Sequence, residues 1–122
     1  MNGRVLVVDD SGLARRSVRQ MLERAGYVVS EAEDGMAALE RYALERHDLV
    51  LLDLVMKGMY GLDVLAKLRE LDSSVRVVVV SADIQKPSRE SAADGGAVAF
   101  VNKPVDETEL VTVVNAALKV SR

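Results

Sequence analysis

The chain has 122 residues and no cysteine, which excludes disulfides and thiolate metal sites. Its length suits one domain with its own core, so we expect residues 1–122 to form a single domain. A net charge of −3 argues against a nucleic-acid-binding surface, and no apolar run approaches the ~20 residues of a membrane span. Because the chain opens without a leader segment and lacks cysteine, we expect a cytoplasmic location.

The first half of the chain alternates apolar strands with amphipathic helices. Val5–Val8 predicts a strand buried on both faces, because the run is apolar throughout and rich in Val. Residues 11–25 predict a helix ended by Gly26, followed by a short strand at 27–29. Asp34 is expected to cap a helix over 35–46, and residues 48–53 predict the third strand.

The second half repeats this alternation with one weak helix. Glycines predict a loop at 57–61, followed by a helix at 62–71 and an apolar strand at 75–80. Residues 87–94 predict a polar fourth helix with few apolar anchors, and 97–101 the fifth strand. Asp106 and Glu109 resemble a capping box for a last helix that runs to about residue 120. These units predict an α/β fold, a doubly wound five-stranded parallel sheet.

In such sheets ligands bind beyond the C-terminal ends of the strands. The polar residues that follow the predicted strands are Asp9, Asp10, Glu31, Asp53, Ser81 and Lys103. Any one of the acids alone suits a helix cap or a turn. Three converging carboxylates repel one another, however, and a hard divalent cation such as Mg²⁺ would relieve that repulsion.

The residues at these strand ends suit phosphoryl transfer. Magnesium usually implies a phosphate partner, and Lys103 and Ser81 offer an ammonium and a hydroxyl to phosphate oxygens. A carboxylate can itself accept a phosphoryl group, and Asp53 is the best candidate because it ends the central strand. Asp9 and Asp10 would then hold the metal.

Two rival functions share part of this pattern. A phosphatase of the haloacid dehalogenase type uses an aspartyl nucleophile but needs a second Asp two residues later, where this chain has Val55. A flavodoxin-like cofactor binder needs a phosphate-binding loop after its first strand, where this chain has Asp9 and Asp10. Both features disfavour the rivals.

The segments VLVVDDS, LVLLDLVMKGMYGLDVL, VVVSAD and AFVNKP resemble the receiver domain of two-component response regulators, in particular single-domain chemotaxis regulators. The resemblance covers essentially the whole chain and implies a flavodoxin-like (βα)5 fold with strand order 2-1-3-4-5. It implies a signalling phosphoacceptor, not an enzyme with a separate substrate. A histidine kinase or histidine phosphotransfer protein would phosphorylate it. A phosphorelay intermediate and a receiver excised from a larger regulator or hybrid kinase stay open as alternatives.

The resemblance also implies roles for single residues at the site. Asp53 is the phosphoacceptor, and Asp9 and Asp10 are the acidic metal pair. The Asp53 carboxylate and the backbone carbonyl of Val55 complete the protein ligands of Mg²⁺. Lys103 is the lysine of the site, and its bond to the following proline matches a peptide bond that is commonly cis in the family.

The resemblance implies a switch as well, and the chain departs from the family beside it. Ser81 matches the switch hydroxyl and Phe100 the switch aromatic, which would change the face of the fourth helix, fifth strand and fifth helix for a downstream protein. Many receivers carry proline where this chain has Lys57, and we expect the change to alter the loop without touching the chemistry. Val55 and Asp83 flank the route of attacking water, so we expect them to modulate the phosphoryl lifetime.

Two further features suggest no function. Arg15, Arg16 and Arg19 cluster, and we expect them to form a solvated helix face. His47, the one histidine of the chain, lies where a helix leads into a strand, and we expect it at the surface.

Overall fold

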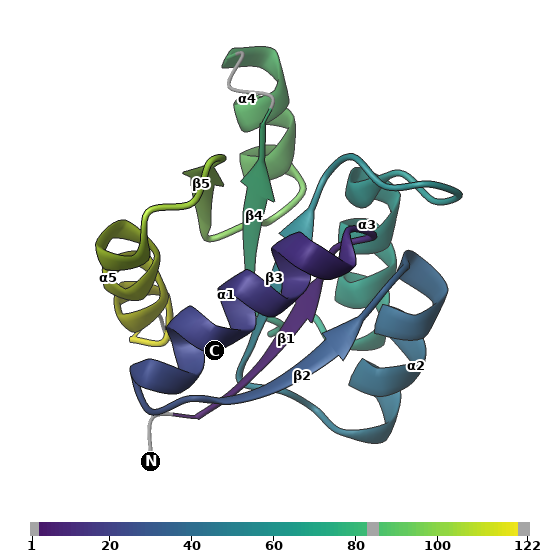
Figure 1. Ribbon diagram of the computed structural model, residues 1–122. Coiled ribbons are helices and arrows are strands. Elements are labelled where there is room, and N and C mark those ends of the chain that lie inside the picture. The colour runs from purple at the N-terminus through teal and green to yellow at the C-terminus, as the bar shows by residue number, and fades with distance from the viewer. Residues whose placement is uncertain (1–2, 83–85, 120–122) are drawn as a thin grey trace.

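The computed structural model describes residues 3–82 and 86–119 of the chain (Figure 1). The strands are β1 (Arg4–Val8), β2 (Val28–Ala32), β3 (Leu49–Asp53), β4 (Val77–Ser81) and β5 (Ala99–Asn102). The helices are α1 (Gly12–Arg24), α2 (Gly35–Leu44), α3 (Gly61–Leu71), α4 (Lys86–Asp94) and α5 (Glu107–Ala117). All strand pairs are parallel, in the order β2-β1-β3-β4-β5. The predicted fold and strand order are therefore confirmed.

The sheet separates two apolar cores, because alternate side chains of a strand point to opposite faces. Helices α1 and α5 cover one face, and α2, α3 and α4 pack against the other (Figure 1). Every residue of β3 and β4 is buried, as expected for central parallel strands. Within the described ranges no helix is long and apolar enough to cross a bilayer.

Short polar side chains begin three of the helices, and the sequence predicts two of these caps, Asp34 and Asp106. Ser11, Asp34 and Asp106 each accept a hydrogen bond from the main-chain N–H three residues further on, at 3.2, 2.8 and 2.9 Å. Each satisfies one of the N–H groups that a helix start leaves without an internal partner. These caps fix where the loops above the sheet turn into helices.

The second strand is longer than predicted. A short strand that starts at 27–29 and ends before Glu31 is expected, but β2 runs to Ala32 because Ser30 and Glu31 continue the pairing with Leu6 and Val7 of β1. Since β2 is an edge strand, it tolerates polar side chains that the apolar pattern of a central strand would not contain. Other boundaries shift by up to three residues, because the terminal turns of helices and the ends of strands fray.

His47 is buried, not at the surface. Only 2% of the residue is exposed, and its ring stacks on Tyr42 with centroids 6.2 Å apart. Neither ring nitrogen has a hydrogen-bond partner in the described part of the protein. The expectation is wrong because the neighbours of His47 in sequence are polar, whereas the residue lies two positions before the buried strand β3 and packs against Tyr42 of α2.

Candidate functional site

The strand register brings the polar strand ends together. Asp9 follows the residue of β1 that pairs with Leu52, so it lies beside Asp53. Ser81 lies one residue beyond the β4 partner of Asp53, and Lys103 one residue beyond the β5 partner of Ser81. The pairing alone therefore gathers side chains from four strands at one edge of the sheet.

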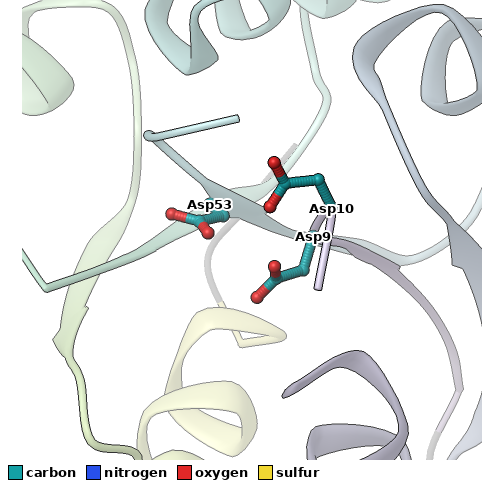
Figure 2. A group of neighbouring side chains, drawn as sticks. All are labelled: Asp9, Asp10 and Asp53. Carbon is teal, nitrogen blue, oxygen red and sulfur yellow. The ribbon is translucent and has the colours of Figure 1, made fainter. Parts of the chain in front are cut away.

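Three carboxylates form a compact cluster at this edge. Asp9, Asp10 and Asp53 each offer an oxygen within 4.8 Å of the other two (Figure 2). Asp9 and Asp53 are buried, whereas Asp10 is exposed and opens the cluster to solvent. An all-oxygen donor set with one open side fits Mg²⁺, which binds through one or two carboxylates and keeps several waters.

Lys103 partly neutralises this cluster. Its Nζ donates to Oδ2 of Asp9 at 2.8 Å and to Oδ2 of Asp53 at 3.0 Å. Burial lowers the pKa of Lys103, but the bonds to both carboxylates outweigh it and the net shift is upward. Burial raises the pKa of Asp53. The N–H of Val55 and the ammonium of Lys103 lower it, but burial has the larger effect and the net shift is upward. The single ammonium therefore neutralises only part of the charge of the three carboxylates.

Main-chain amides from the neighbouring loops hold each carboxylate as well. The donors are the N–H groups of Ser11 to Asp9 at 2.9 Å, Val55 to Asp53 at 3.1 Å and Lys57 to Asp10 at 3.0 Å. The lysine that replaces the family's proline therefore brings a main-chain N–H to the cluster; that the change leaves the chemistry untouched stays a prediction. The Lys57 amide contacts a predicted metal ligand, a contact that no side-chain pattern could have indicated.

Gly61 is a residue of this site that the sequence reasoning treated only as part of a loop. A Cβ there would lie 2.5 Å from Cα of Leu54 and 2.7 Å from the carbonyl oxygen of Asp53. The Gly61 N–H donates to the Leu54 carbonyl at 2.9 Å and closes the loop after β3. The signal was a glycine directly before an apolar helix, which marks close approach of two backbones.

The arginines of α1 also differ from expectation. The Arg15 side chain is 15% exposed; it donates to Oε1 of Glu31 and to the main-chain carbonyl of Asp9, both at 2.7 Å. Arg19 pairs with Oε2 of Glu31 at 2.8 Å, which lowers the pKa of that carboxyl. Glu31 therefore belongs to an ion-pair network between α1 and β2, not to the acid cluster. The prediction of a solvated arginine face fails for Arg15, whereas the Arg19 side chain forms an ion pair and is still 41% exposed.

The predicted switch residues lie between the acid cluster and α4. Ser81 is buried, and its carbonyl accepts the Lys103 N–H at 2.9 Å. Phe100 is half-buried and lines a groove of about 590 Å³ between α4 and β5, with the Arg89 guanidinium 5.4 Å from its ring centroid. Asp83 lies outside the described residues. The peptide bond after Lys103 is cis, as the resemblance implied.

Comparison with known proteins decides the family. Residues 5–115 match the model of the response regulator receiver domain. The chain belongs to this family. It is 33% identical over 119 residues to the chemotaxis protein CheY of Bacillus subtilis, covering 97% of this chain and 99% of that relative. Receivers of this kind are signalling proteins, not classical enzymes.

Two further relatives show how receivers are used in different contexts. This receiver is 48% identical over 104 residues to protein-glutamate methylesterase/protein-glutamine glutaminase 5 of Myxococcus xanthus, covering 83% of this chain but 30% of the relative. It superimposes with a TM-score of 0.90 and 28% identity on a chain of the CheX-CheY-BeF3-Mg+2 complex from Borrelia burgdorferi, covering 96% of this chain and 90% of that one. The receiver fold thus occurs both alone and as part of longer proteins.

Proposed function

We propose that this receiver accepts a phosphoryl group on Asp53 from a histidine kinase or a histidine phosphotransfer protein. The observation that carries the proposal is the convergence of three carboxylates with one lysine at the ends of three strands, β1, β3 and β5. Asp9, Asp10 and Asp53, with the Val55 carbonyl, would hold Mg²⁺, which supplies charge neutralisation for phosphoryl oxygens. Such a relative has been solved as a complex with BeF3 and Mg²⁺.

For phosphoryl transfer, the protein must orient the Asp53 carboxylate and neutralise the charge of the phosphoryl oxygens. A carboxylate oxygen of Asp53 attacks the phosphorus of a phosphohistidine; the O–P bond forms as the P–N bond breaks, and the imidazole leaves. The carboxylate is already oriented, because the Val55 N–H holds one oxygen and the Lys103 ammonium the other. Lys103 would follow the added negative charge, since it is shared with Asp9 and needs only a small shift.

The signal would be read on the surface of α4, β5 and α5. Ser81 would move toward the phosphoryl group, and Phe100 would turn into the space vacated. Of the α4 side chains that the structure describes, Ala92 alone is buried, so this helix has few apolar anchors. A weakly anchored helix beside the half-buried Phe100 is an element that a small bias can shift. The partner is a downstream protein that binds this face.

Incubation with acetyl phosphate and Mg²⁺, followed by intact mass measurement, tests the phosphoacceptor. The wild type should gain one phosphoryl mass and Asp53→Asn none. Asp63→Asn, which changes an exposed acid in the first turn of α3, is the matched control and should label like the wild type. Full labelling of Asp53→Asn would show that the acceptor lies elsewhere.

Amide NMR tests the switch separately. Phosphorylation should move resonances between Ser81 and Lys103 and on the surface of α5. Changes confined to the loop after β3 would rule out this route while leaving the phosphoacceptor in place.

A further inference from the structure

We propose that the main-chain amide of Lys57 is a positioning group for magnesium binding, because it holds Asp10 in place before the metal arrives. The inference rests on the proposed function, since it concerns the metal site of that reaction. The Lys57 N–H donates to Oδ2 of Asp10 at 3.0 Å, across 47 positions of sequence. The bond connects the loop after β3 to the loop after β1. The predicted phosphoacceptor, Asp53, is the last residue of β3.

The three acids of the cluster are held unequally. Asp9 and Asp53 are buried and share the Lys103 ammonium, which fixes one oxygen of each. Asp10 is exposed, so without the Lys57 amide its side chain would lose all of its rotational freedom at the moment a metal binds, which weakens binding. The Lys57 amide removes part of that cost in advance, as preorganisation does at other binding sites.

The bond is compatible with metal binding. A carboxylate has two oxygens and about four acceptor positions, so one N–H leaves capacity for a cation. The Lys57 N–H also places the positive end of a dipole against Asp10, which offsets repulsion from the neighbouring carboxylates while no metal is present. The amide and the cation therefore act on the same carboxylate without competing for all of its lone pairs.

Because the donor is a main-chain group, its effect on magnesium binding can be measured separately from that of the Lys57 side chain. The side chain of Lys57 is exposed, and the amide alone makes the bond to Asp10. Proline lacks the N–H, whereas alanine keeps it and removes only the ammonium. Lys57→Pro and Lys57→Ala are therefore a matched pair that distinguishes the amide from the charge.

Isothermal titration of the full chain with Mg²⁺ tests the proposal. Lys57→Pro should bind Mg²⁺ about three- to tenfold more weakly than the wild type, the range that corresponds to the net contribution of one typical intramolecular hydrogen bond. Lys57→Ala should bind within about twofold of the wild type. Equal binding by Lys57→Pro and the wild type, or an equal loss in Lys57→Ala, would overturn the proposal.

The Asp10→Ala background checks that the effect passes through Asp10, because alanine has no acceptor for the Lys57 N–H. Adding Lys57→Pro to Asp10→Ala should weaken Mg²⁺ binding far less than adding it to the wild type. A loss of the same size in both backgrounds would mean that proline acts through loop geometry, and the proposal would fall. Should Lys57→Pro not fold, the Lys57 amide proton of the wild type decides: Asp10→Ala should move it upfield, and an unmoved resonance would refute the bond.

These outcomes differ from a failure of the proposed function. A wild type that neither binds Mg²⁺ nor labels on Asp53 would overturn both proposals together. A wild type that binds and labels, with unaltered Mg²⁺ affinity in Lys57→Pro, would overturn the role of the amide alone.

Discussion

His47 should make the stability of this protein fall as the pH drops below about 6.5. The imidazole is 2% exposed and lacks a hydrogen-bond partner in the described residues, so folding removes it from water without compensation. Burial lowers its pKa below the ordinary value of 6.5; Glu45 and Asp48 oppose the shift, while Arg4 and Arg41 add to it. The folded state therefore excludes a proton that the unfolded state accepts.

The sign and size of the effect follow from proton linkage. Because the folded-state pKa of His47 is the lower one, its cost is absent above the unfolded pKa and grows as the pH falls toward the folded pKa. The slope cannot exceed about 1.4 kcal/mol per pH unit for one group. Between about pH 6.5 and pH 5 the free energy of unfolding should drop by up to about 2 kcal/mol.

Urea unfolding of the wild type and His47→Phe at several pH values measures this contribution. Phenylalanine keeps a ring against Tyr42 and removes the titrating group, so the difference between the two proteins cancels the carboxylates that titrate near pH 4. The stability of His47→Phe should change less between pH 7 and pH 5. Identical pH slopes, or an imidazole that titrates near pH 6.5 in NMR spectra of the folded chain, would refute the argument; with one histidine the resonance is unambiguous.

Three other substitutions probe separate features. Gly61→Ala should lower the free energy of unfolding by about 1–3 kcal/mol in urea, because its Cβ meets the Leu54 backbone at 2.5 Å; a neutral change would contradict this crowding. The Ser74 hydroxyl and then the Tyr42 phenol hold the pKa of Asp72 at about 2, so Tyr42→Phe, which removes a donor at 2.7 Å, should raise that pKa part of the way toward 3.8 in NMR titration; the lost stability should be present above pH 4 and fade as the pH falls toward 2. Val55→Asn should speed autodephosphorylation in Mg²⁺, because the 63%-exposed valine offers water no hydrogen bond; an equal or slower rate would show that Val55 is not the control.

The sheet and the cluster of acids could be predicted because they depend on local pattern and a general rule of topology. Apolar runs ending in Asp9, Asp10 and Asp53 indicate buried parallel strands, and parallel strands place their carboxyl ends at one edge. Lys103 followed from the same rule. Their convergence needed no knowledge of side-chain contacts.

The features that were missed depend on contacts between distant segments. Arg15 and Glu31 look like surface charges one by one, and only the packing of α1 against β2 shows that they pair. His47 sits among polar neighbours in sequence and under Tyr42 in space. The bond from the Lys57 amide leaves no mark in the sequence, because every residue except proline has a main-chain N–H.

The donors around the acid cluster show where the site is rigid and where it can respond. Asp9 and Asp53 stand at the ends of strands packed on both faces, so their backbones have little freedom. The groups that satisfy them come from loops and from one long side chain, Lys103. New charge on the Asp53 side chain would therefore be accommodated by moving the donors while the strands stay in place. Lys103 follows β5 directly and its N–H donates to the Ser81 carbonyl, so under the proposed function its displacement would act on the ends of β4 and β5 next to α4.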